Sequence, residues 1–370
     1  MNSYNHSHDD DNQSLDDAQL DDINGNIALA DDRQQENADS VINDKDHPFY
    51  KLTPDTVIDA VESTGVLSDF RIIALNSYEN RVYQVGIEAS QPLIAKFYRP
   101  NRWTDAQILE EHQFTQELFD ADLPVVPAII NKQRHTTLLH HGAFRFSLFQ
   151  RRGGHAPELD NLDHLYQLGQ TIGRIHAVAS TGCFKHRIAI DFDCYAADSV
   201  AFISQHFMPA ALKPAYQSIT DLLLAELEQQ WRHNDNVKHI RLHGDCHPGN
   251  ILWRDDAPNF VDFDDCLTGP AIQDLWMMLN GDRNNQILQL SEIVDGYNEF
   301  HDFDKREIRL IEVLRSFRIL HHCAWIARRW RDPAFPMHFP WFNTEKYWAQ
   351  HILDLKEQLS ALQEEPLVLF

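Results

Sequence analysis

The sequence predicts an α+β protein of two lobes, in which a small antiparallel sheet with one helix precedes a mainly helical part. Between residues 71 and 149, short apolar runs alternate with polar turns, as expected for strands joined by hairpins. From residue 162 onward, apolar residues recur every three or four positions, which is typical of amphipathic helices. The 370 residues, 43% of them hydrophobic, are enough to give each lobe a core of its own.

Charge marks a boundary before the folded part. Residues 1–47 contain thirteen acidic side chains against Arg33 and Lys45, so they carry −11 of the formal net charge of −24. This segment has few large apolar residues and cannot bury enough surface to offset its chain entropy. We expect a disordered acidic extension over 1–47, a solvating segment rather than a regulatory arm. The N-terminal lobe would then cover 48–150 and the C-terminal lobe 151–370.

Composition also excludes several classes of protein. A strongly negative charge opposes binding to nucleic acid or to anionic membranes, because both need basic surfaces. The five cysteines are scattered and lack metal-binding spacing, so the sequence indicates a reducing compartment and no disulfide framework. No apolar run approaches the roughly 18 residues of a spanning helix, and no basic leader opens the chain. We expect a cytoplasmic monomer.

The N-terminal lobe begins with a helix from Pro54 to about Thr64, since proline suits the first helical position. Two strands, 71–75 and 81–87, then flank the polar turn 76–80, which includes Ser77.

The next strand, 93–98, carries Lys96 in the middle of an apolar run. Lysine is rarely buried without a partner, although an edge lysine can extend its amine to solvent. The helix that follows starts with a capping box at Thr104 and places Glu111 on its apolar stripe. We therefore predict an ion pair between Lys96 and Glu111.

Two further strands, 136–139 and 143–149, complete the sheet, and the glycine-containing segment 150–154 leads into the second lobe. In that lobe the apolar periodicity predicts helices over 162–179, 214–233, 287–300, 305–330 and 344–362.

The segment with the clearest chemistry lies between these helices. A short strand, 237–242, leads into a loop from His243 to Asn250 that contains Asp245. The strands 250–254 and 260–263 then form a hairpin around the turn 255–259, which brings Asp262 back beside Asn250. Asp274 follows, at the start of a predicted helix from which it would brace this loop.

These residue types match the needs of phosphoryl transfer. One aspartate, Asp245, would accept the proton of the attacking hydroxyl, while Asn250 and Asp262 would hold the magnesium ion that bridges the nucleotide phosphates. The spacing Asp-x4-Asn followed by a carboxylate after the next hairpin is that of the protein-kinase catalytic loop. Two other interpretations remain open: a metal site formed by His243, Asp245 and His247, and aspartate and asparagine that only cap a turn.

The motifs also resemble a known family. The His-Gly-Asp at 243–245, with Asn250-Ile251-Leu252 and Val261-Asp262-Phe263-Asp264, resembles the aminoglycoside phosphotransferase and choline kinase superfamily, with Asp264 as a possible second acidic group. Five further segments resemble the bacterial stress response kinase A family: residues 75–84, 96–100, 108–114, 274–276 and 331–336. The resemblance covers nearly all of residues 50–365, but not the acidic extension.

This resemblance implies a two-lobed, protein-kinase-like fold and an ATP-dependent serine/threonine protein kinase of the stress response that uses Mg²⁺. It implies Asp245 as the catalytic base, Asn250 and Asp262 as magnesium ligands, and Ser77 as an ATP contact. Lys96, paired with Glu111, would position the phosphates. The partners would be proteins with serine or threonine acceptors, the chain itself being one candidate.

Two other functions remain open. The first is phosphorylation of a small amino alcohol or aminoglycoside-like compound. The second is a nucleotide-sensing scaffold without catalysis, which the presence of a base in addition to the binding residues argues against.

Overall fold

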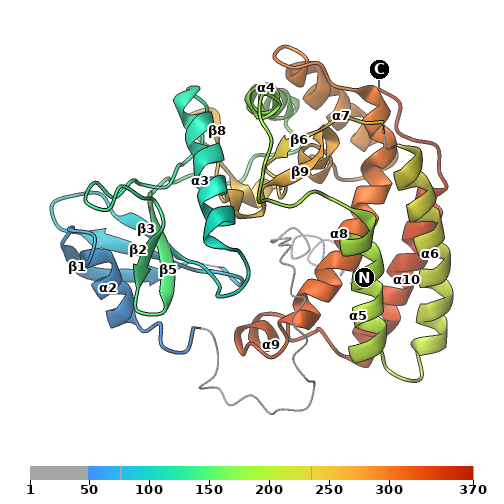
Figure 1. Cartoon of the computed structure of the whole chain (residues 1–370). Helices are drawn as coiled ribbons and strands as arrows, with labels where there is room; N and C mark the ends of the chain where they lie inside the picture. The colour runs from blue at the N-terminus through green and yellow to red at the C-terminus, as the bar shows by residue number, and fades with distance from the viewer. Residues whose placement is uncertain (1–48, 76, 235, 370) are drawn as a thin grey trace, which may run out of the picture.

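The computed structural model describes residues 49–75, 77–234 and 236–369, so the predicted acidic extension lies outside the described residues. The described chain forms two lobes (Figure 1). A five-stranded sheet with one helix lies on one side, and a larger, mainly helical lobe lies on the other. This arrangement confirms the predicted fold class.

The sheet is antiparallel, with the strand order β1-β2-β3-β5-β4. Its elements are α2 (Pro54–Glu62), β1 (Ser68–Ala74), β2 (Arg81–Ile87), β3 (Leu93–Phe97), β4 (Leu139–His141) and β5 (Phe144–Gln150). Thr53 caps α2, and Val57, Ala60 and Val61 of α2 form one apolar cluster with the sheet. Within this sheet Lys96 of β3 lies opposite Val82 of β2 and Ser147 of β5, so it is on a central strand.

Helix α3 (Asp105–Asp120) begins with the predicted capping box, in which Thr104 and Gln107 satisfy each other's backbone amides. Its apolar residues Ile108, Phe114 and Leu118 belong to the large cluster of the helical lobe, not to the cluster of the sheet. Helix α3 therefore joins the two lobes (Figure 1).

The helical lobe contains α4 (Leu162–Ala179), α5 (Asp198–His206), α6 (Lys213–His233), α7 (Arg283–Tyr297), α8 (Ile311–Arg328), α9 (Ala334–His338) and α10 (Glu345–Leu362). Helices α4 and α7 approach closely through glycines. A Cβ atom at Gly169 would lie 2.0 Å from the Ile293 carbonyl oxygen, and one at Gly296 would lie 2.1 Å from that of Tyr166.

Several predictions about local structure were wrong. The predicted helices did not include α5, the π-helical turn before it (Asp193–Ala197) or α9. The predicted helix over 305–330 begins as a 3₁₀ turn, Lys305–Leu310. Asp274 ends another 3₁₀ turn, Ala271–Asp274, rather than starting an α-helix.

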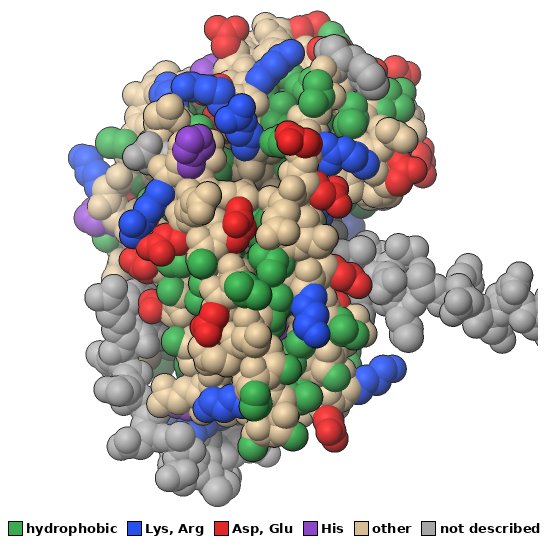
Figure 2. Space-filling view, turned by 90° about the vertical axis from the view of Figure 1, so that its right-hand side faces the viewer, with side chains coloured by type: hydrophobic (Ala, Val, Ile, Leu, Met, Phe, Trp, Pro, Cys, Tyr) green, Lys and Arg blue, Asp and Glu red, His purple; other side chains and the backbone are tan. Residues whose placement is uncertain are grey.

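The surface agrees with the composition. Figure 2 shows acidic and basic side chains interspersed over one face of the molecule, without one continuous basic patch. Among the described helices, none has both the length and the apolar character needed to cross a membrane.

The close contact of α4 and α7 predicts that Gly169→Ala destabilises the fold. Alanine favours a helix by about 1 kcal/mol over glycine, so a net loss must come from the clash with Ile293. We expect a net loss of about 1–3 kcal/mol in the free energy of unfolding, measured by urea denaturation. The control is Gly153→Ala, where the nearest atom to the added Cβ is 3.7 Å away. Equal stability of the two variants would contradict the packing argument.

Candidate active site

The loop His243–Asn250 is held by a rigid frame on both sides. Strand β6 (His239–Leu242), which precedes it, pairs with β9 (Leu267–Pro270). The Asp274 carboxylate accepts the backbone N–H groups of His243 at 2.8 Å and of Gly244 at 2.9 Å. Gly244 has a φ of +86°, a conformation that glycine adopts without strain. The predicted bracing role of Asp274 thus has a direct structural basis.

The hairpin after the loop is tighter than predicted. Its strands are β7 (Ile251–Arg254) and β8 (Ala257–Phe260), so the turn consists of Asp255 and Asp256 rather than 255–259. Both turn residues have positive φ, the conformation of a two-residue type I′ turn, and aspartate tolerates it. The second strand consequently ends before Asp262.

Asp262 nevertheless returns to Asn250. The Val261 N–H donates to the Asn250 carbonyl oxygen at 3.0 Å, which places the residue after Val261 next to Asn250. Asp262 itself has a φ of +59° and begins a 3₁₀ turn, Phe263–Asp265. Its side chain is 35% exposed, whereas those of Asp264 and Asp245 are enclosed.

Asp245 lies in a buried polar environment. Arg318 of α8 donates to its Oδ1 at 2.9 Å, and the Asn250 amide nitrogen lies 3.4 Å from its Oδ2. Burial disfavours the charge on Asp245, but His247 and Arg318 outweigh this effect and hold the pKa of the carboxyl below its usual range. Because burial also lowers the pKa of His247, the permanent positive charge beside Asp245 is that of Arg318.

Lys96 connects the sheet to this loop. Its Nζ lies 2.7 Å from Asp262 Oδ1 and 2.9 Å from Asp264 Oδ1. Burial opposes the charge on Lys96, but Asp262 and Asp264, with Glu111 as a further contributor, raise its pKa well above the ordinary value. The amine is therefore a fixed cation that two carboxylates hold beside Asn250.

Glu111 lies near Lys96 but does not form the predicted ion pair with it. Its Oε2 atom lies 3.0 Å from Arg187 Nη2. Among the described residues, Glu111 forms no ion pair with Lys96. Lys96 instead forms its ion pairs with Asp262 and Asp264. Burial raises the pKa of Glu111 to about 7 even though Lys96 and Arg187 are close.

Arg102 forms ion pairs with two neighbouring carboxylates, Asp264 and Asp265. Its guanidinium contacts Asp264 and Asp265, each at 2.5 Å, and all three side chains are buried. Burial opposes ionisation of Asp264, but Arg102 and Lys96 prevail and lower the pKa of this carboxyl. Asp264 thus links Lys96 to Arg102 rather than facing solvent as a metal ligand would.

Ser77 lies in the segment that joins β1 and β2, and Arg81, where this segment enters β2, pairs with Phe97 at the end of β3. Its hydroxyl donates to the Asn80 carbonyl oxygen at 3.0 Å. The Asn80 side chain accepts the backbone N–H of Arg99 at 3.1 Å, so the segment is fixed to the residues that follow Lys96.

Asn250 and Asp262 fit a hard divalent cation. The Asn250 amide nitrogen donates to the Asp245 carbonyl oxygen at 3.0 Å, so its oxygen is the end that can serve as a ligand. Together with the Asp262 carboxylate it offers the oxygen donors that Mg²⁺ prefers, and phosphates and water normally complete such a shell. Within the described residues, no group of three His, Cys, Asp or Glu side chains forms an all-protein metal cage.

The two histidines of the loop are engaged in local hydrogen bonds. His243 Nε2 lies 2.9 Å from the Val261 carbonyl oxygen, and His247 Nδ1 accepts the Gly249 N–H at 3.0 Å. These contacts favour a structural role for both over the alternative metal site formed with Asp245.

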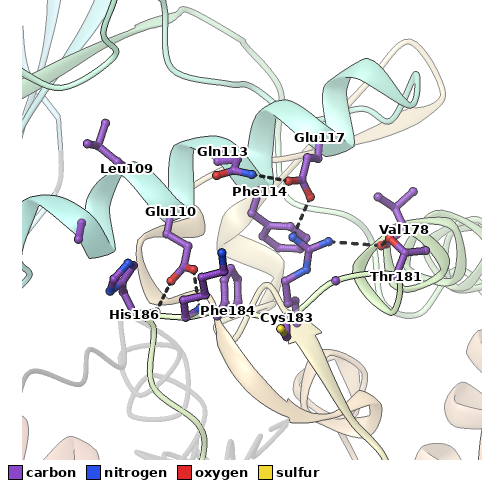
Figure 3. Close-up of a pocket in the computed structure, with 14 residues that line it drawn as sticks. Leu109, Glu110, Gln113, Phe114, Glu117, Val178, Thr181, Cys183, Phe184 and His186 are labelled. Atoms are coloured by element: carbon purple, nitrogen blue, oxygen red, sulfur yellow. Dashed lines mark hydrogen bonds and ion pairs between the residues drawn. The ribbon is translucent and has the colours of Figure 1, made fainter.

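A separate cavity of about 840 Å³ opens between α3 and residues 178–186 (Figure 3). Glu110 lies there and accepts the backbone N–H groups of Lys185, His186 and Arg187. The predicted site residues Lys96, Asp245, Asn250 and Asp262 do not line this cavity.

Sequence reasoning missed three arginines: Arg102, Arg187 and Arg318. Each is buried and pairs with a carboxylate from a distant part of the chain. A charged residue on the apolar face of a predicted helix is a usable signal for Arg318, since arginine is almost never fully buried unless paired. Arg102 and Arg187 lie in irregular segments, where no periodicity indicates burial.

Residues 71–311 match the model of the family described as "Phosphotransferase enzyme family". The chain is 46% identical to "Stress response kinase A" of Escherichia coli K12 over 330 residues, which cover 89% of this chain and 99% of the relative. It is 43% identical, with the same coverage, to "Serine/threonine protein kinase RdoA" of Salmonella typhimurium.

Two solved structures share the fold at low sequence identity. An amicoumacin kinase in complex with AMP-PNP, Ca²⁺ and Ami has a TM-score of 0.64 at 16% identity, and the match covers 84% of this chain and 94% of that one. A microcompartment-associated aminopropanol kinase has a TM-score of 0.60 at 18% identity, with coverage of 82% and 97%.

The brace of the loop generates a prediction about pH. Glu307 accepts the Ile272 N–H at 2.9 Å and so supports the 3₁₀ turn that carries Asp274. Burial raises the pKa of the Glu307 carboxyl from 4.5 to about 7. A carboxyl whose pKa is higher in the folded than in the unfolded state stabilises the folded state at pH values below the unfolded-state pKa. This stabilisation is lost as the pH rises to the folded-state pKa.

We therefore expect the free energy of unfolding of the wild type to fall by about 1–3 kcal/mol more than that of Glu307→Gln between pH 4.5 and 7. Urea denaturation at several pH values measures this difference, and glutamine keeps an oxygen for the Ile272 N–H. Parallel pH curves for the two proteins would show that the pKa of Glu307 is the same in the folded and unfolded states.

Proposed function

The chain belongs to the phosphotransferase enzyme family and is a kinase, and we propose that it transfers the γ-phosphoryl group of ATP to serine or threonine hydroxyls of proteins. The observation that carries this proposal is the convergence of Asp245, Asn250 and Asp262 beneath Lys96, which comes from the other lobe. The names of the curated relatives, stress response kinase A and serine/threonine protein kinase RdoA, support a protein acceptor and a role in stress.

In the proposed mechanism, Asp245 receives the proton of the acceptor hydroxyl while the oxygen of that hydroxyl bonds to the γ-phosphorus. The bond between that phosphorus and the β,γ-bridging oxygen breaks, and ADP leaves. Arg318 keeps Asp245 ionised, and Asn250 holds its backbone in place. A magnesium ion held by Asn250 and Asp262 would neutralise the phosphate charge.

The sheet supplies the proposed nucleotide contacts. Lys96 is a fixed cation at the edge of the metal site and would bind phosphate oxygens. Ser77, in the segment between β1 and β2, would contact ATP, because the corresponding loop of protein kinases covers the nucleotide phosphates. Glu111 would act at a distance, as a buried carboxylate paired with Arg187 that adds to the negative field around Lys96.

We also propose that the protein acts in the cytoplasm. None of the five cysteines, all of which lie in the described part of the chain, forms a disulfide, and three of them are buried. Such cysteine usage is typical of a reducing compartment.

Asp245→Asn is expected to lower turnover by roughly 10²- to 10⁴-fold, the usual effect of removing a positioned base. The measurement is phosphate incorporation from radiolabelled ATP, with circular dichroism to show that the variant is folded. Asp256→Asn is the matched control, because Asp256 lies exposed in the hairpin turn and asparagine also tolerates its positive φ. Near-normal turnover of Asp245→Asn would remove Asp245 from the role of base.

Lys96→Ala is expected to weaken the productive use of ATP, seen as a higher KM for ATP or a lower kcat/KM. The lost cation removes the proposed phosphate contact and leaves Asp262 without its partner, whereas Asp264 keeps Arg102. Unchanged ATP kinetics in a folded variant would assign Lys96 to structure alone.

The main alternative is a small amino alcohol or aminoglycoside-like acceptor, since two structural relatives are named as kinases of small molecules. Incubation with radiolabelled ATP and a cell lysate, followed by separation of proteins from metabolites, distinguishes the two classes. We expect label in the protein fraction that depends on Asp245, and mass spectrometry of phosphosites then identifies the acceptor. Label confined to metabolites would favour the alternative, and no turnover would favour a nucleotide-sensing scaffold.

A further inference from the structure

The segment between β1 and β2 is fastened to the far lobe by a buried carboxylate. Glu79 lies one residue before Asn80 in this segment, and its side chain is fully enclosed. Its Oε2 lies 2.5 Å from Arg329 Nε and accepts the indole N–H of Trp325 at 2.8 Å. Both partners come from the end of α8, about 250 residues further along the chain.

A second ion pair runs beside the first. Arg99, which follows β3, contacts Asp332 at 2.8 Å and Glu79 at 3.4 Å. Arg81, at the start of β2, lies 3.7 Å from Asp332. We call these five residues, Glu79, Arg81, Arg99, Arg329 and Asp332, the interlobe latch.

Aromatic rings pack next to the interlobe latch. The Trp325 ring contacts Phe335 and Phe339 at centroid distances of 5.0 and 6.0 Å. Tyr78, the neighbour of Glu79, contacts Phe339 at 5.1 Å and His338 at 4.8 Å. These rings keep water away from the neighbouring ion pairs of the latch. The attraction between opposite charges is stronger where water is excluded.

The side chains of the latch carry a net positive charge. Three arginines face two carboxylates, so the latch carries one net positive charge in a chain of net charge −24. Burial opposes the charge on Glu79, but Arg329, Arg102 and Arg99 overcome it and lower the pKa of this carboxyl. The Glu79 carboxylate therefore stays ionised at neutral pH.

The segment has no glycine-rich sequence to wrap phosphates closely, so something else must fix its position. We propose that the interlobe latch positions Ser77 and the backbone of residues 77–80 over the ATP phosphates, with Glu79 and Arg329 as positioning residues that slow nucleotide release. This inference rests on the proposed function, because it assumes that ATP binds beneath this segment. It assigns to the 325–339 region of the helical lobe a role in nucleotide retention.

The test compares Glu79→Gln with the wild type. Glutamine keeps the shape and one oxygen for Trp325 but removes the charge that Arg329 and Arg99 face. We expect dissociation of a fluorescent ADP analogue, followed by stopped flow, to accelerate by about tenfold or more, the loss expected for one charge-assisted hydrogen bond. The KM for ATP should rise by a similar factor, while kcat at saturating ATP changes by less than about threefold, since binding rather than the chemical step is lost.

The matched control is Glu88→Gln, which removes an exposed carboxylate from the same lobe just after β2. Should Glu79→Gln fail to fold, Tyr78→Ala tests the same idea, because it removes a half-buried ring that joins the segment to Phe339 and is expected to speed ADP release in the same direction.

Folded variants that release the ADP analogue at the wild-type rate, or more slowly, would overturn the latch. A fall in kcat with unchanged ADP release would also overturn it. Failure of the wild type to bind the analogue with magnesium present would instead count against the proposed function itself, so the two failures are distinguishable.

Discussion

The structure depends on the buried ionic contacts around Lys96. This amine is carried by the central strand of the sheet, yet both carboxylates that hold it, Asp262 and Asp264, belong to the helical lobe. Arg102 continues the chain of charges to Asp265. Removing one member of such a network leaves another charge buried and unpaired, which typically costs about 3–5 kcal/mol. The same contacts that join the lobes therefore also fix Lys96, Asp262 and Asp264 relative to one another.

The part of the site that the sequence could predict is the part encoded by neighbouring residues. The spacing of Asp245, Asn250 and Asp262 places them within one loop and one hairpin, so local geometry was enough to bring them together. The capping box at Thr104 and the helix over 162–179 were equally local, and the structure confirms both. The error in the hairpin turn arose because two adjacent aspartates adopted positive φ, a choice that asparagine-glycine sequences signal far more clearly.

The unpredicted part depends on contacts between distant segments. The sequence indicated that Lys96 needs a carboxylate partner and that Glu111 faces inward, and both side chains are buried. It could not show that Arg187, 76 residues after Glu111, reaches that carboxylate, or that Asp264 reaches Lys96. Arg318 and Asp245 are 73 residues apart and meet only because α8 packs behind the loop. Pairing of this kind is decided by tertiary packing, which periodicity does not encode.

The division of apolar and ionic contacts between the lobes has a consequence for the reaction. The sheet and α2 have an apolar cluster of their own, while α3 shares the cluster of the helical lobe. Ion pairs connect the sheet and its connecting segments to the helical lobe at Lys96 and at the interlobe latch. Separation of ion pairs is compensated by hydration of the charges, whereas separation of an apolar interface is not. An ionic junction thus suits the proposed mechanism, in which an acceptor hydroxyl has to reach the fully enclosed Asp245 carboxylate.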